Sequence, residues 1–342
     1  MSNYMGDPVM RYSAPGMLAI LPLFATFANA QSQEVALDWE GFLPIGGIEQ
    51  WISIRGESPA NPVILYLHGG PGEALSPFPS TFDRWYREFT VVLWDQRGSG
   101  KTYGRNRSSP EDMTLEQLTQ DAIEIAEYAL DRLNKDKLVL VGQSWGSMVG
   151  WKVALRNPEL FHAYVGTGQS VSWARTVEGQ EAYARARAQA ADDEVALEAM
   201  DDAQGAPLYS FERTAPFRAW IMPPSDVKFI EMQRDYVGPE PIPQEGEVWD
   251  WVRGFGFSVD ALGGEILRFD AYEIGLDSTI PVVVIQGRDD HVTPYQAAQE
   301  FVRDIRAPTK RFVPIDGGHF AYYTNSEAFV AALTEYVIPL IE

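Results

Sequence analysis

The chain has 342 residues and a formal net charge of −21 at pH 7, with 45% hydrophobic and 12% aromatic residues. This content is typical of a globular protein, and the negative charge disfavours binding to nucleic acid or to anionic membrane surfaces. The sequence contains no cysteine, which excludes disulfides, thiolate catalysis and thiolate metal sites.

Residues 1–30 predict a signal peptide. Arg11 precedes an apolar stretch at residues 17–27, and Ala28-Asn29-Ala30 matches an A-x-A cleavage site. The apolar stretch is too short to span a bilayer comfortably. We therefore expect cleavage near Ala30, a periplasmic or secreted location, and no membrane insertion after the signal is removed. A disordered N-terminal tail is the alternative.

The first half of the remaining chain alternates between strand and helix patterns. Residues 37–57 predict an antiparallel hairpin around the turn at residues 44–47. Thr114, with Gln117 three residues later, resembles a capping box that opens a helix ending near Leu133. Continuous apolar runs predict buried strands at residues 61–67, 89–94, 138–141 and 163–166.

The pattern changes after Ser170, because the short apolar runs disappear and helical stretches such as residues 178–191 alternate with loops. Strand patterns resume afterwards, at residues 281–285 and 311–315. We interpret residues 170–277 as a mainly helical cap. It is inserted into a core that comprises residues 31–169 and 278–342.

The alternation of strands and helices predicts an α/β fold with a mostly parallel, doubly wound sheet. In such sheets, ligands bind beyond the carboxyl ends of the strands. His68, Ser144, Asp290 and His319 each lie just past the carboxyl end of a predicted strand. We therefore expect the functional site at this edge of the sheet.

The stretch Gly142-Gln143-Ser144-Trp145-Gly146 lies between the buried strand and a helix-like segment. A G-x-S-x-G sequence in a strand–turn–helix context is typical of a nucleophile elbow, which holds the serine oxygen at its tip. The two glycines fall where strand and helix nearly touch, so a side chain there would clash. Ser144 is therefore the candidate nucleophile.

Acyl transfer by a serine also requires a base, a group that orients the base, and donors for the oxyanion. His319 follows two glycines at the end of the last strand, where the backbone can turn sharply and present the imidazole to the edge of the sheet. We predict it to be the base. His68 is expected to organise a Gly-rich loop, His291 to lie near the site or at the surface, and His162 to be structural.

The orienting acid is expected between the serine and the histidine in the chain. Asp289 and Asp290 both follow the strand at residues 281–285, and only one can point at His319, because adjacent side chains diverge. We favour Asp290 over Asp289. Asp316 lies beside the histidine loop in the sequence, but such a neighbour is more often a turn former. The oxyanion donors are expected to be the backbone N–H groups of Trp145 and of Gly70.

Five motifs together resemble the α/β-hydrolases, and within that fold the proline iminopeptidase-like serine hydrolases. They are His68-Gly69-Gly70-Pro71-Gly72, Trp94-Asp95-Gln96-Arg97-Gly98-Ser99-Gly100, Gly142-Gln143-Ser144-Trp145-Gly146, Gly287-Arg288-Asp289-Asp290 and Gly317-Gly318-His319. The resemblance implies an α/β-hydrolase fold, the acid at Asp290, and oxyanion donors from Gly70 and Trp145. Family members release N-terminal residues from short peptides, and relatives cleave other small amides and esters.

The resemblance also implies that acidic residues of the cap bind the free amine of the substrate. The cap of this chain has no W-x-x-W-E stretch of the kind found in true iminopeptidases. Glu178, Trp249 and Trp251 are the candidates for substrate contacts in its place. Solvated surface charge is the alternative for the acidic residues.

We therefore expect a serine hydrolase that cleaves small amides or esters through an acyl-enzyme, as an aminopeptidase related to the proline iminopeptidases. Carboxylesterase or lactonase action on the same triad is the close alternative. A non-catalytic ligand-binding homologue is the remote one. The expected partner is a small molecule or short peptide, with no cofactor and no metal ion.

Overall fold

The computed structural model describes residues 36–239, 241, 242 and 244–341. The predicted signal peptide and its cleavage site near Ala30 lie outside these residues. Eight strands form one sheet in the order β1-β2-β4-β3-β5-β6-β7-β8. Their bounds are β1 Leu37–Ile45, β2 Ile48–Gly56, β3 Val63–Leu67, β4 Thr90–Trp94, β5 Leu138–Gln143, β6 Phe161–Thr167, β7 Val282–Gly287 and β8 Lys310–Ile315.

The strands from β4 to β8 in this order are all parallel, whereas β1 pairs with β2, and β2 with β4, in antiparallel fashion. Each residue of β3, β4 and β5 is buried, as expected for parallel strands that are covered on both faces. Residues of β3 alternate between two hydrophobic clusters: Leu65 belongs to one with Leu118 and Val149, and Tyr66 to the other with Phe82 and Trp85. The predicted mostly parallel, doubly wound sheet is confirmed.

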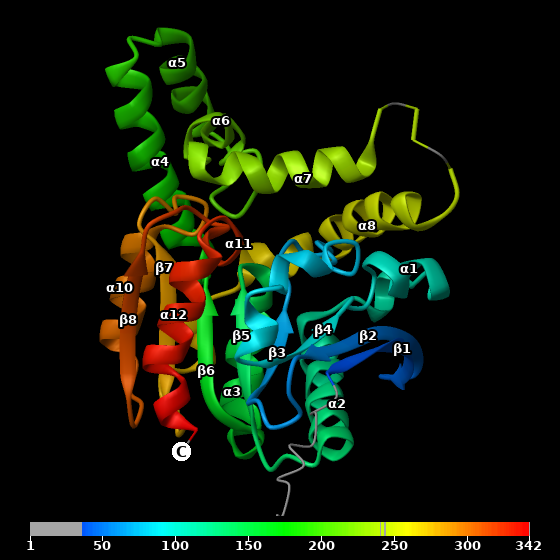
Figure 1. Cartoon of the computed structure of the whole chain (residues 1–342). Coiled ribbons are helices and arrows are strands. Elements are labelled where there is room, and N and C mark those ends of the chain that lie inside the picture. The colour runs from blue at the N-terminus through cyan, green and yellow to red at the C-terminus, as the bar shows by residue number, and fades with distance from the viewer. Residues whose placement is uncertain (1–35, 240, 243, 342) are drawn as a thin grey trace, which may run out of the picture. The chain divides into compact units, whose positions relative to one another are not determined.

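Helices follow most strands along the chain (Figure 1). In the core they are α1 Gly100–Asn106, α2 Leu115–Leu133, α3 Trp145–Arg156, α10 Tyr295–Asp304, α11 Ala321–Thr324 and α12 Ser326–Tyr336. The predicted cap of α2 is confirmed, because Thr114 Oγ1 accepts a hydrogen bond of 3.0 Å from the Gln117 N–H. Such a cap satisfies one of the backbone donors that a helix start leaves unpaired.

Between β6 and β7 the described residues form helices and loops and no further strand of the sheet, as the sequence pattern indicated (Figure 1). These helices are α4 Trp173–Ala190, α5 Glu194–Ala203, α6 Arg218–Ile221, α7 Val227–Val237, α8 Glu247–Arg268 and α9 Ala271–Ile274. Trp173, Phe217 and Met200 belong to a small hydrophobic cluster of their own. The described residues nevertheless form one compact unit, so the division into a core and a cap at residues 170 and 277 stays a prediction.

Candidate active site

The turn after β5 has the backbone geometry of a sharp elbow. Ser144 has φ 52° and ψ −119°, and α3 begins at the next residue. An added Cβ would lie 2.6 Å from the Gly146 carbonyl oxygen at Gly142, and 2.0 Å from the Leu67 carbonyl oxygen at Gly146. Both contacts are shorter than a side chain tolerates, so Gly142 lets β5 meet α3, and Gly146 lets α3 approach the end of β3. A strained backbone conformation of this kind costs about 1–3 kcal/mol, and such residues cluster at active sites.

His319 and Asp290 form a buried pair. The Nδ1 atom of His319 lies 3.0 Å from Oδ2 and 3.2 Å from Oδ1 of Asp290. Gln286 Nε2 and Thr293 Oγ1 donate further hydrogen bonds to Asp290 Oδ2, of 2.7 and 2.9 Å. Asp289, by contrast, is exposed. Of the two adjacent aspartates that the sequence offered, Asp290 is therefore the one that meets the imidazole.

The imidazole also reaches the elbow. His319 Nε2 lies 3.4 Å from the side-chain Nε2 of Gln143, the residue directly before Ser144. A Cβ added to Gly168 would lie only 2.8 Å from His319 Cε1. The ring thus has one nitrogen on Asp290 and the other beside Gln143, the residue that precedes Ser144 in the chain.

The charges around His319 favour its protonated form. Burial lowers the pKa of His319, but Asp290 raises it through charge and hydrogen bonding, and Asp226 and Glu73 raise it further, so that the net shift is upward. A histidine in this setting stabilises the imidazolium that forms when it accepts a proton. A general base has to hold a proton during the reaction, so stabilisation of its charged form suits this role.

The loop after β3 approaches the elbow closely. Gly70 has φ 108°, a conformation that glycine adopts without steric penalty. A Cβ on the neighbouring Gly69 would lie 3.1 Å from Ser144 Cβ. Gly70 and Trp145 line the same cavity as Ser144. The two predicted sources of backbone N–H donors therefore flank the serine.

Gln96, which the sequence analysis did not select, connects three of the five motifs. Its Nε2 donates to the His68 carbonyl oxygen at 2.9 Å, and its Oε1 accepts from the Trp145 indole N–H at 3.0 Å. Burial lowers the pKa of His68 to about 4, so the ring is neutral and its Nε2 accepts the backbone N–H of Gln96 at 3.2 Å. His68 therefore organises the Gly-rich loop, as expected.

A cavity of about 450 Å³ opens at Ser144. Most of its wall comes from the segment between β6 and β7. The apolar lining residues are Met148, Trp173, Phe211, Ile221, Met222, Phe255, Ile266 and Val292, and the polar ones outside the elbow are Ser170, Ser172, Thr176, Gln180, Thr214, Arg218 and Thr293. Among the described residues that line the cavity, none carries a carboxylate.

The three cap residues selected from the sequence lie elsewhere. Glu178 is exposed and lines a separate pocket with Arg175 and His291. Trp251 is buried, and its indole N–H donates to the Ala74 carbonyl oxygen at 2.9 Å, which fixes α8 to the loop after β3. The ring of Trp249 lies under the guanidinium of Arg253, 5.4 Å away. The structure does not bring these side chains to the cavity at Ser144.

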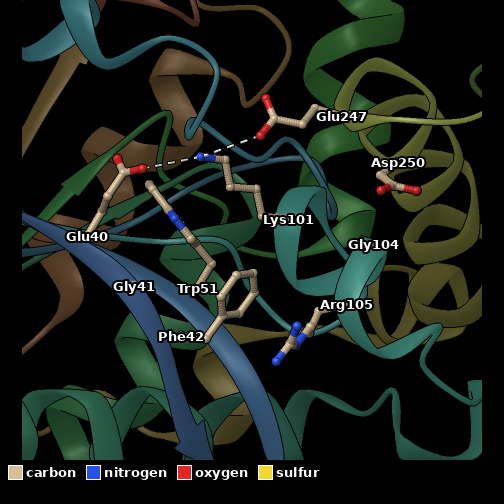
Figure 2. A pocket seen from close by; sticks show the side chains of 9 residues that line it. All are labelled: Glu40, Gly41, Phe42, Trp51, Lys101, Gly104, Arg105, Glu247 and Asp250. Carbon is tan, nitrogen blue, oxygen red and sulfur yellow. Dashed lines mark ion pairs between the residues drawn. The ribbon is translucent and has the colours of Figure 1, made fainter.

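Glu247, another acidic residue of the cap, contacts the core at a further pocket whose lining does not include Ser144. Figure 2 shows Lys101 between two carboxylates, with its Nζ 3.5 Å from Glu40 Oε1 and 3.8 Å from Glu247 Oε1. The same ammonium lies 4.9 Å from the centre of the Trp51 ring. Glu247 therefore has a cationic partner within the chain, and exposed pairs of this kind contribute about 0–1 kcal/mol.

Comparison with known proteins shows the family to which the chain belongs. Residues 62–326 match the family model described as alpha/beta hydrolase fold, which is more than half of the chain. The chain therefore belongs to the α/β-hydrolase fold family, as the motifs predicted. In the described part of the chain, no helix has both the length and the hydropathy that a bilayer crossing requires.

The chain is also similar to individual proteins over most of its length. The chain is 27% identical over 303 residues to a Bacillus subtilis protein named "Probable aminopeptidase YbaC", covering 86% of this chain and 94% of the relative. It is 24% identical over 314 residues to the proline iminopeptidase of Lacticaseibacillus rhamnosus, covering 87% and 97%. The solved structure of the proline iminopeptidase-related protein TTHA1809 of Thermus thermophilus matches with a TM-score of 0.63 at 21% identity, covering 89% and 98%. The predicted similarity to proline iminopeptidase-like α/β-hydrolases is confirmed.

Proposed function

We propose that this protein is a serine hydrolase that cleaves small amides or esters through an acyl-enzyme, as an aminopeptidase related to the proline iminopeptidases. The observation that carries the proposal is the buried His319–Asp290 pair, whose imidazole contacts Gln143 directly before the strained Ser144 elbow. The names of the relatives, aminopeptidase and proline iminopeptidase, support the choice of substrate class.

In the proposed mechanism, His319 takes the proton from Ser144 Oγ, which attacks the carbonyl carbon of the substrate. The N–H groups of Trp145 and Gly70 bind the oxyanion of the tetrahedral intermediate. Asp290 fixes the imidazole tautomer and stabilises its charged form. His319 then protonates the leaving group, and a water molecule activated by the same base releases the acid and restores Ser144.

Esterase or lactonase action on the same triad is the second candidate, and the cavity lining favours it. An aminopeptidase has to compensate the positive charge of the substrate's free α-amine, and a carboxylate is the usual partner. The described lining offers the guanidinium of Arg218 and no carboxylate. Its large apolar surface suits an apolar acyl group in either case.

A panel of chromogenic substrates on the purified protein tests the proposal. For an aminopeptidase, we expect turnover of leucyl and phenylalanyl arylamides, and loss of that turnover when the α-amine is acetylated. The matched control is the p-nitrophenyl ester of the same acyl group with and without the acetyl block. Turnover of the p-nitrophenyl ester that survives the block, without turnover of the arylamide, identifies an esterase. No turnover of any substrate, with no labelling by a fluorophosphonate, contradicts hydrolase function altogether.

We further propose that residues 1–30 direct export and are removed near Ala30. The proposal is supported by Arg11, the apolar stretch and the A-x-A site in the sequence. We expect the protein expressed in a Gram-negative host to be recovered from the periplasm or the medium, with an N-terminus directly after Ala30 by mass spectrometry. A cytoplasmic protein that retains these residues contradicts the proposal.

A further inference from the structure

One face of α7 contacts two loops of the candidate active site. Asp226 lies directly before this helix, and Phe229 and Gln233 follow at spacings of three and four residues, which places the three side chains on one side. Asp226 and Phe229 are buried. None of the three was selected by the sequence analysis, and none lines the cavity at Ser144.

Asp226 holds the backbone of the histidine loop. Its Oδ2 accepts the N–H of His319 at 2.7 Å, and its Oδ1 accepts the N–H of Phe320 at 3.3 Å. A Cβ on Gly318 would lie 2.3 Å from Asp226 Oδ2 and equally close to Pro223 Cγ, so the loop and the turn before α7 fit only with glycine at this position. Two carboxylates thus fix His319: Asp290 through the ring, and Asp226 through the main chain.

The next two residues of this face extend the contact. The ring of Phe229 stacks on that of Phe320, with centroids 4.1 Å apart and planes 20° apart. Gln233 Nε2 donates to Glu73 Oε1 at 2.8 Å. Glu73 belongs to the loop that contains Gly70, where its own N–H donates to the Gly69 carbonyl oxygen at 3.2 Å. The same helix therefore contacts the loop of the base and the loop of the predicted oxyanion donor.

Two buried carboxylates take part in these contacts, Asp226 before α7 and Glu73 in the Gly70 loop. Their hydrogen bonds favour the charged form, which burial disfavours. Burial raises the pKa of Asp226 to about 6, against the opposing effect of His319 and the two N–H donors. Burial likewise raises the pKa of Glu73 to about 6, against the hydrogen bond from Gln233. Removal of a partner from such a group leaves a buried polar atom unsatisfied, which costs about 1–3 kcal/mol and favours rearrangement of the loop.

We propose that Asp226 and Gln233 are positioning residues, through which α7 sets the geometry of the His319 loop and of the Gly70 loop. The inference rests on the proposed serine hydrolase function. It assigns to α7 a role in the chemical step. This role is separate from that of the residues between β6 and β7 that line the cavity at Ser144. A displacement of about 1 Å at a reacting group can lower a rate by about 10²-fold, so small shifts of either loop suffice.

The variants Asp226→Ala, Asp226→Asn and Gln233→Leu test the proposal on the full mature protein. We expect Asp226→Ala to lower kcat for a p-nitrophenyl ester by about 10- to 100-fold with KM changed less than about threefold. Fluorophosphonate labelling of Ser144 is expected to slow in proportion. Asp226→Asn keeps one carbonyl oxygen for the His319 N–H and is expected to recover part of the rate. Gln233→Leu is expected to lower kcat about 10-fold by displacing the Gly70 loop.

The matched control is Asp235→Asn, at an exposed position of the same helix, which is expected to retain the wild-type kcat and labelling rate. Near-UV circular dichroism checks that each variant is folded. If Asp226→Ala does not fold, Asp226→Asn and Gln233→Leu decide the outcome. Wild-type kcat and labelling rates in the folded variants overturn the positioning role. An inactive, unlabelled wild-type protein overturns the proposed function instead.

Discussion

Ser144→Ala is expected to abolish turnover, lowering kcat by about 10⁶-fold on whichever substrate the wild-type protein hydrolyses best. The reason is that the proposed acyl-enzyme has no other acceptor: Ser144 is the residue of the elbow after β5, and its neighbour Gln143 contacts His319. A fluorophosphonate should add to the wild-type protein at Ser144 and leave the variant unmodified, as judged by intact mass and peptide mapping. Some activity above that of water is expected to remain, because the oxyanion donors are main-chain groups.

Ser80→Ala is the matched control, since this serine is exposed and lies on the loop between β3 and β4. It is expected to retain both turnover and labelling. Undiminished hydrolysis by Ser144→Ala, with a circular dichroism spectrum like that of the wild type, would falsify the assignment of the nucleophile.

Asp290→Asn is expected to lower kcat by about 10⁴-fold while leaving KM nearly unchanged. The asparagine amide can donate to His319 Nδ1, which forces the proton onto Nε2, the nitrogen that has to accept the proton of Ser144. The side chain keeps its size, and the N–H groups of Val292 and Thr293 retain an oxygen acceptor at this position, but the Gln286 amide loses the acceptor that Asp290 Oδ2 supplies. We therefore expect a lower unfolding temperature as well, and the loss of kcat is measured where thermal unfolding shows both proteins to be folded.

The pH profile gives a second readout for this variant. Asp290 is the main group that raises the pKa of His319 against the effect of burial. Without its negative charge the pKa of His319 falls, and because the base acts in its neutral form, the acid limb of the residual kcat moves to lower pH. Asp289→Asn, at the exposed neighbouring position, is the control and is expected to leave both kcat and the acid limb unchanged. Equal losses in the two variants would contradict the role given to Asp290.

The sheet and the elbow were predictable because their signals are local. Apolar runs mark strands that are buried on both faces. Gly142 marks the point where β5 touches α3, and Gly146 the point where α3 touches the end of β3. The choice of Asp290 over Asp289 was open on spacing alone. It depends on which of two adjacent side chains the turn after β7 directs inward, and Asp290 is held there by hydrogen bonds from Gln286 and Thr293.

The supporting contacts were not predictable, because they depend on long-range packing. Asp226 lies 93 residues before His319 in the chain and follows two prolines and a serine, a sequence typical of a turn. Gln96 belongs to the second of the five motifs, but neither periodicity nor spacing gave its side chain a role. Its role follows from the meeting of three loops that only the folded sheet brings together.

The side chains that α8 contributes to the cavity at Ser144 were likewise not predictable from the sequence. Composition selected its tryptophans, but the orientation of the helix places Phe255 at the cavity and Trp251 against the Ala74 carbonyl oxygen. The two rings stack with centroids 6.3 Å apart, so the inner residue supports the outer one. Which of them a ligand meets is decided by the docking of the whole helix and not by residue type.

The start of α3 at Trp145 has a consequence for the end of the reaction cycle. The first N–H groups of a helix lack partners within it, and its aligned peptide dipoles place partial positive charge at this end. Under the proposed mechanism, the oxyanion forms in this field, and so does the carboxylate of the released acid. Charge attraction that lowers the barrier to acylation therefore also retains the product, and departure of the acid from the cavity becomes a step that competes with chemistry for control of the turnover rate.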